Sequence, residues 1–129
     1  MIKVYINKQS SYPVSTPALK KRLIAFFEKE GIVSNADVSV SIVGEKRMLE
    51  LAEKHLQEKE VLHNVLSFTA SETPGKFLYP PDNLIHLGDI VICFQKAFEE
   101  AKAEQKMIDD KIWELIEHGA HHLLGHHHE

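Results

Sequence analysis

The chain has 129 residues, of which 43% are hydrophobic and 26% are charged, so it can bury a core and we expect one domain over residues 1–129. No segment approaches about twenty consecutive apolar residues, and the first residues alternate in polarity. These features argue against a membrane span and a signal peptide, and we expect a cytoplasmic protein without a membrane partner. The single cysteine, Cys93, excludes an internal disulfide framework, and its apolar neighbours predict a buried position.

The formal net charge of −4 is not typical of a nucleic-acid-binding protein. Charge is unevenly divided, however. Residues 1–66 contain ten Lys or Arg and eight Asp or Glu, a net +2, whereas residues 67–129 contain five and eleven, a net −6. We therefore expect any nucleic-acid footprint on the N-terminal half. The most concentrated basic cluster there is Lys20–Arg22, although such a triplet is also typical of a solvated helix face.

Hydrophobic spacing predicts strands and helices along the whole chain. Residues 2–6 alternate as a strand, and a helix is predicted from Thr16, with Pro17 in its first turn and Gly31 as its stop. The further predicted elements are, in chain order, a strand over 38–42, a helix over 45–59, a strand over 61–68, a loop over 71–83, a strand over 84–93, a helix over 94–106 and a helix from Asp109 or Asp110 to Leu124. This order predicts an α+β fold, in which helices pack on a small mixed β-sheet of about four strands.

Three histidines near the C-terminus follow the spacing His-x-x-x-His-x-x-Gly-x-x-His. His118 and His122 are four residues apart in the last predicted helix, so both imidazoles can face one point. Gly125 is placed to end that helix with a positive φ and to fold the chain back, which would bring His128 to the same point. Three protein ligands leave a fourth position open for a water that ionises near neutral pH, so the pattern predicts a catalytic metal site on the C-terminal helix. We expect one Zn²⁺, although imidazole also suits nickel, cobalt and copper.

Two interpretations without a metal stay open. A purification-tag remnant would also cluster histidines at a C-terminus, but tags are uninterrupted runs, whereas this pattern begins inside an amphipathic helix. A pair of surface histidines at this spacing also occurs by chance. His121 lies on a different helix face from His118 and His122, and no geometric argument supports His126 or His127, so these three are left out of the ligand set.

Three segments carry motifs that point to one known family. The run His118-Gly-Ala-His-His-Leu-Leu-Gly-His-His-His128 resembles the signature His-Gly-x-x-His-Leu-x-Gly-Tyr-Asp-His. Asn64-Val-Leu-Ser-Phe68 is similar to an Asp/Asn-Val-Leu-Ser-Phe strand, and Leu87-Gly-Asp-Ile-Val-Ile92 to a Leu-Gly-Asp-Ile strand. All three motifs are those of the YbeY family of ribosomal-RNA maturation endoribonucleases, and they occur in the same order. The resemblance covers most of the chain.

The resemblance implies a single-domain, cytoplasmic, zinc-dependent endoribonuclease that cleaves single-stranded RNA. It also implies roles in 16S rRNA 3′-end maturation and ribosome quality control, with rRNA and the small ribosomal subunit or its associated proteins as partners. The nucleophile would be a metal-activated water or the RNA 2′-hydroxyl, and the sequence does not separate the two. Asp89 matches the aspartate of the Leu-Gly-Asp-Ile strand and is the predicted catalytic carboxylate near the metal; alternatively it binds a neighbouring backbone group.

The chain departs from the family pattern at two places. Family members carry an arginine seven residues before the Asp/Asn of the third strand, whereas counting back from Asn64 without gaps reaches Gln57. The candidates for supplying the missing positive charge are Lys54, Lys59 and the more distant Arg47. The Tyr-Asp of the signature is replaced by His126 and His127.

Two other functions are weighed against the nuclease. A metzincin-like peptidase has the same ligand spacing, but it needs a glutamate as general base at the position of Gly119. Glu117 lies one residue before the metal pair, on a different helix face. A non-catalytic ribosome- or RNA-binding module that keeps the metal for stability is favoured by the absent arginine.

Overall fold

Alternating strands and helices make up the described part of the chain, residues 1–70 and 84–125 of a computed structural model. The elements are, in chain order, β1 (Ile2–Asn7), α1 (Thr16–Lys29), β2 (Ala36–Val43), α2 (Glu45–Leu56), β3 (Val65–Thr69), β4 (Ile85–Cys93), α3 (Phe94–Glu104) and α4 (Ile108–Gly125). Their order confirms the predicted α+β class. The predicted loop over 71–83 and the residues 126–129 lie outside the described ranges. No helix within those ranges has the length and apolar character that crossing a membrane requires.

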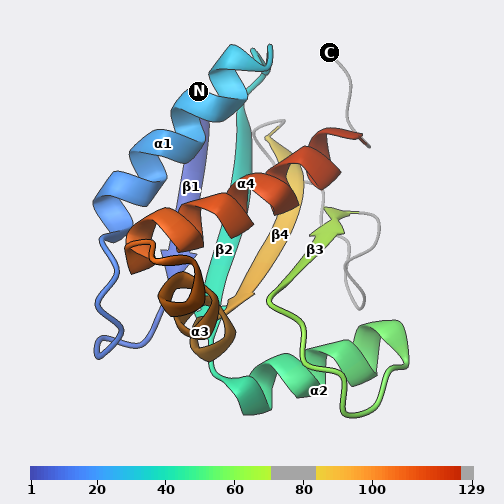
Figure 1. The fold of residues 1–129 in the computed structure, drawn as a ribbon. Helices are drawn as coiled ribbons and strands as arrows, with labels where there is room; N and C mark the ends of the chain where they lie inside the picture. Colours follow the sequence, from blue (N-terminus) through green and yellow to red (C-terminus); the bar gives the residue numbers. More distant parts are fainter. Residues whose placement is uncertain (71–83, 126–129) are drawn as a thin grey trace.

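The four strands form one mixed sheet in the order β1-β2-β4-β3. Strands β1, β2 and β4 are parallel, and β3 pairs antiparallel with β4 at the edge of the described sheet. Figure 1 shows α4 crossing one face of this sheet beside α1, while α2 lies at the end of the sheet where β2 stops. The sequence predicted this arrangement of helices on a small mixed sheet.

One face of the sheet forms the main core with α1 and α4. In β2 the residues Val38, Val40 and Ile42 are buried, and those between them are only partly buried, as strand alternation requires. The buried side chains that the two helices add to this core are Leu19, Leu23, Phe27, Ile112, Ile116 and Leu123. The apolar spacing of both helices therefore serves a single core.

The opposite face of the sheet is covered in part by α2. Met48 and Ala52 of this helix pack with Val91 and Cys93 of β4 in a second, smaller core cluster. Cys93 is buried as predicted, and burial raises the pKa of its thiol. Ser39, Ser41 and Asp89 on the same face are only partly buried, so α2 and the sheet leave an open surface beside the smaller cluster.

The two largest errors in the predicted element boundaries lie around the connection from α2 to β3. The helix predicted over 45–59 ends at Leu56, because Gln57 adopts a left-handed conformation with φ of 54°. The strand predicted over 61–68 begins only at Val65. Glu60 also has a positive φ, of 60°, which turns the chain before the sheet is reached. The apolar residues in this turn therefore made the predicted strand too long.

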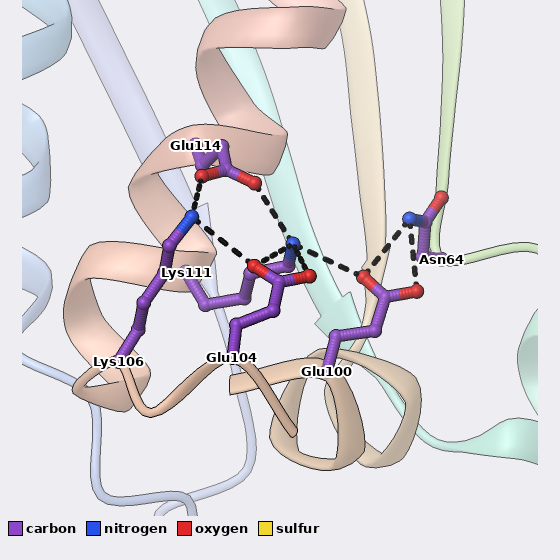
Figure 2. Close-up of polar contacts among 6 residues, drawn as sticks. All are labelled: Asn64, Glu100, Glu104, Lys106, Lys111 and Glu114. Atoms are coloured by element: carbon purple, nitrogen blue, oxygen red, sulfur yellow. Dashed lines mark hydrogen bonds and ion pairs between the residues drawn. The ribbon is translucent and has the colours of Figure 1, made fainter. Parts of the chain in front are cut away.

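A polar network joins α3 to α4 and reaches the start of β3 (Figure 2). The side chain of Lys111 is only 6% exposed and contacts three carboxylates, those of Glu100, Glu104 and Glu114. Burial opposes its charged form, but hydrogen bonds to Glu114 and Glu104 outweigh this and raise the pKa of Lys111. The Asn64 amide donates to both Glu100 oxygens at 3.2 and 3.3 Å. Asn64 thus connects α3 to the start of β3, the strand whose sequence resembles a YbeY motif.

Candidate active site

His118 and His122 lie one helical turn apart on α4, and both are exposed. The helix is amphipathic: its apolar residues face the core, so the two histidines remain at the surface. Residues four apart project from the same face of a helix, which lets two imidazoles approach one ion. The pair therefore fits the donor set of a transition-metal site.

His121 is also exposed on α4 but contacts a different part of the protein. Its ring packs edge-on against Phe26 of α1, with ring centroids 5.0 Å apart. This contact agrees with the exclusion of His121 from the predicted ligand set. It also makes His121 a natural control for changes to His118 and His122.

The third predicted ligand, His128, lies outside the described residues, as do His126 and His127. Within residues 1–70 and 84–125 no three His, Cys, Asp or Glu side chains form a metal-binding group. The predicted positive φ at Gly125 is wrong, because the described glycines with positive φ are Gly31 and Gly88. Helical geometry continues through Gly125. The three-histidine site stays a prediction.

Asp89 lies on β4, and its side chain faces α2 rather than α4. Ile90, the next residue, belongs to the main core, and a Cβ placed on Gly119 of α4 would lie 2.9 Å from its Cγ2 atom. Neighbouring strand residues point to opposite faces, so Asp89 is on the far side of the sheet from α4. The structure therefore does not bring Asp89 to the same face as His118 and His122, and a catalytic role for it stays a prediction.

Asp89 lines a hollow of about 330 Å³ between α2 and the sheet. Arg47 and Lys54 line it from α2, and Phe68 contributes an aromatic ring from β3. We call this space the first hollow; the remaining residues around it are Ser41, Val43, Leu51, His55 and Val91. Two cations, a ring and hydrogen-bonding groups suit a ligand that has both a phosphate and a base.

His55 indicates two properties of the first hollow, namely its positive charge and a buried polar atom without a hydrogen-bond partner among the described residues. Burial lowers its pKa, and the charges of Lys54 and Arg47 lower it further. Its Nδ1 atom is buried and has no hydrogen-bond partner within the described part of the chain. A buried nitrogen of this kind is costly unless a ligand or water completes its bonding.

The three basic candidates for replacing the family arginine lie at different places on and after α2. Gln57 is exposed at the end of α2, and Lys59 is exposed in the turn that follows. Of the three basic candidates, Lys54 and Arg47 line the first hollow. Both belong to residues 1–66, the half in which the charge distribution predicted a nucleic-acid footprint.

The Lys20–Arg22 cluster lies on α1, and its arginine packs against α4. The Arg22 guanidinium lies 4.8 Å from the ring centre of Trp113 and pairs with Asp110 at 3.7 Å. Lys20 and Lys21 are exposed on the same helix. The cluster is thus in part a structural link between α1 and α4, whereas the cations of the first hollow face a cavity.

His86 is a site residue that the sequence did not single out. Its Nδ1 lies 2.5 Å from Asp37 Oδ1, and its Nε2 lies 3.5 Å from Asp89 Oδ2. Residues 86 and 89 would normally face opposite sides of a strand. In β4, Leu87 is an extra residue, because Asp37 pairs with His86 while Val38 pairs with Gly88, whose φ is 149°. This bulge puts His86 and Asp89 on one face, which spacing alone could not reveal.

Comparison with known proteins identifies the family. The family model described as Endoribonuclease YbeY matches residues 4–129, which is nearly the whole chain. The chain belongs to the YbeY family. The Endoribonuclease YbeY of Thermus thermophilus is 35% identical over 129 residues, covering 100% of this chain and 87% of that relative. That of Macrococcus caseolyticus is 33% identical over 112 residues (87% and 71%), and that of Bartonella quintana 34% identical over 123 residues (95% and 73%).

The YbeY match extends through all three histidines of the predicted metal site. A tag remnant does not explain a family match that continues to residue 129. The fold adds an argument against the peptidase, since residue 119 faces β4 at close contact and its position leaves no space for a glutamate. Both observations favour the YbeY-like interpretation of the C-terminal motif.

Proposed function

We propose that this protein is a metal-dependent endoribonuclease that cleaves single-stranded RNA. The observation that carries the proposal is the YbeY family match over residues 4–129, which includes the exposed pair His118 and His122 on one face of α4. The relatives named above are called endoribonucleases. A first hollow lined by Arg47 and Lys54 is consistent with an RNA substrate.

His118, His122 and His128 would hold the metal, for which we propose one Zn²⁺. Two exposed imidazoles one turn apart supply the right donor type, and His128 completes the family motif. When bound, the ion would supply an activated water nucleophile and offset negative charge on a phosphoryl oxygen. The ion's identity is part of this proposal and calls for metal analysis.

The side chains of the first hollow would bind RNA on the face of the sheet opposite His118 and His122. Arg47 and Lys54 would bind phosphate oxygens, and Phe68 would stack on a base. Asp89 remains our candidate catalytic carboxylate. Because it lines the first hollow, it would contact the RNA bound there. His86 would position Asp89 through the contact between its Nε2 and Asp89 Oδ2. Strand β3 lies at the edge of the described sheet, and one RNA strand would pass around this edge from the first hollow to the face that carries His118 and His122.

We further propose a role in 16S rRNA 3′-end maturation and ribosome quality control in the cytoplasm, with the small ribosomal subunit or its associated proteins as partners. Family membership supports this role. The positive charge of residues 1–66 and the cations of the first hollow give the RNA a place to bind.

The proposal is tested by metal content and RNA cleavage in the same preparations. Protein purified without a nickel column should contain about one transition-metal ion per chain and cleave an unstructured RNA. His118→Ala, His122→Ala and His128→Ala should each lose the ion and reduce cleavage by about 100-fold or more, because a ligand matters at least as much as the groups that support it. His121→Ala, whose ring packs on Phe26, should keep both properties.

Other outcomes separate the alternatives. Cleavage that is equal in all variants and in a chelated sample would show contamination and contradict the proposal. Bound metal without cleavage would favour the non-catalytic RNA-binding module, which the Gln57 departure suggests. In that case Gln57→Arg should be tested for a gain of cleavage. Digestion of casein would instead support the peptidase.

A further inference from the structure

A second hollow adjoins the first on the same side of the sheet. It has a volume of about 310 Å³ and lies where β1 and β2 end. The residues around it are Asn7, Lys8, Gln9, Ser41, Ile42, Val43, Gly44 and Arg47. Ser41, Val43 and Arg47 line both hollows, so the two are neighbouring parts of one groove with Arg47 at their junction.

The charges along this groove favour an anionic chain. Lys8 lies in the second hollow, Arg47 at the junction and Lys54 in the first hollow, against one carboxylate, Asp89. His86 contacts that carboxylate and offsets part of its charge. Arg47 pairs with Glu50 at 3.5 Å, but both side chains are more than half exposed, so water screens this pair and a phosphate can replace it.

Lys8 is available for a ligand. Its ammonium donates to the carbonyl oxygen of the adjacent Gln9 at 3.3 Å, and it has no ion pair with an acidic residue among those described. Asn7 and Gln9 beside it are exposed and can donate and accept hydrogen bonds. The second hollow also lies at the carboxyl ends of two parallel strands, where open sheets commonly bind ligands.

We propose that this groove holds two consecutive nucleotides of a single RNA strand. One nucleotide occupies the first hollow, with its base on Phe68. The phosphate that joins the two is bound by Arg47. The second nucleotide lies in the second hollow, where Lys8 binds its other phosphate. Each hollow is at the lower end of the volumes that hold small ligands, which suits a single nucleotide.

This inference rests on the proposed RNA substrate and assigns Lys8 a role that the family motifs do not include. It explains why the junction residue is an arginine, since a guanidinium can bind two oxygens of one phosphate at once. It also predicts that short and long ligands differ in their contacts. A mononucleotide can fill the first hollow alone, and only a longer ligand reaches Lys8.

Two measurements test the groove, both in the full chain carrying His118→Ala so that RNA stays intact. Amide NMR spectra with AMP should show shifts around Phe68 and Val91, and spectra with the 5′-phosphorylated dinucleotide pApA should add shifts at residues 7–9. In fluorescence anisotropy, Lys8→Ala should weaken binding of a ten-nucleotide single-stranded RNA by roughly 3- to 10-fold. It should also reduce the dependence of log affinity on log salt by about 0.7, the value for one phosphate contact on a single strand.

Lys29→Ala is the matched control, because Lys29 is exposed at the end of α1 and lines neither hollow. Equal affinities for the Lys8→Ala and Lys29→Ala proteins, with no pApA shifts at residues 7–9, would overturn the two-nucleotide groove while leaving the RNA substrate intact. If neither the ten-nucleotide RNA nor pApA binds, the proposed function itself fails.

Discussion

His86 lies between two carboxylates on the open face of the sheet, with Asp37 on β2 and Asp89 on its own strand. Hydrogen bonding to Asp89 raises the pKa of His86, burial lowers it in part, and Asp37 raises it again, to about 9. The ordinary value is 6.5. The folded protein thus retains a proton on His86 at pH values at which the unfolded chain has released it.

This pKa predicts how stability depends on pH. A group whose folded pKa is raised contributes stability that is fully present below its unfolded value and is lost as pH rises through its folded value. The contribution of His86 should therefore be complete below about pH 6.5 and disappear as pH rises through about 9. Melting temperatures measured between pH 6 and 10 should fall more steeply for the wild type than for His86→Asn.

A second check is Asp37→Asn, which removes one of the two carboxylates that raise the pKa of His86 and should flatten the profile in part. Parallel profiles for the wild type and His86→Asn would show that the two carboxylates do not hold the imidazolium. The imidazole side chain is 35% exposed, so water screens the pairs and we expect a modest effect.

At the scale of elements, the approach of α4 to β4 depends on Gly119. A Cβ at this position would lie 2.9 Å from Cγ2 and 3.2 Å from Cγ1 of Ile90, whose side chain is fully buried. Gly119→Ala should therefore destabilise the protein by about 1–3 kcal/mol, the usual cost of overpacking a core. Urea unfolding measures this difference.

Gly125→Ala provides the comparison in the same helix. Among the described residues, no atom lies within 4 Å of a Cβ added at Gly125, and Gly125 lacks a positive φ. Alanine favours a helix by up to about 1 kcal/mol over glycine, so this variant should be unchanged or slightly more stable. Similar losses for both variants would mean that contact with Ile90 is not the cause.

The contact between the start of β3 and α3 leads to a second prediction about how elements pack. Asn64 donates two hydrogen bonds to Glu100, which in turn contacts the buried Lys111. Asn64→Asp would replace a donor with a second carboxylate, although the family motif allows either residue. We expect a loss of about 1–3 kcal/mol at pH 7, as when a hydrogen-bonded group loses its partner.

The pH dependence of this variant follows from its charge. A carboxylate beside Glu100 is more easily protonated in the folded state, so the loss should diminish as pH is lowered through the carboxylate range. Adding Glu100→Gln to Asn64→Asp should recover part of the stability, because the amide can then donate to the new carboxylate. Urea unfolding at pH 4.5 and pH 7 checks both points. A loss that is equal at the two pH values would contradict the charge explanation.

For the whole molecule, periodicity predicted most elements and the class of fold. It worked because each helix buries one apolar stripe and β2 alternates strictly, as in Val38 and Val40. It failed where local bonding changes the chain direction. Gln57 and Glu60 have positive φ values, and α2 and β3 are therefore shorter than predicted. Neither residue type indicates such a conformation in the sequence.

The candidate site was predicted less completely than the fold. The His118 and His122 pair could be found because both lie on one helix and four residues apart. Placing Asp89 required knowing which sheet face it occupies, and the first hollow joins residues from β2, α2, β3 and β4. Contacts between distant segments are set by the packing of the whole sheet, so the contacts of His86 with Asp37 and Asp89 had no signal in the linear sequence.

The extra residue Leu87 links the number of residues in β4 to which of its side chains face the open side of the sheet. Deleting Leu87 would restore regular pairing with β2 and leave His86 two residues before Asp89, still on the open face, but it would remove a buried side chain from the core. Homologues with this histidine and aspartate should therefore space them three residues apart where the strand has the extra residue and two apart where it does not.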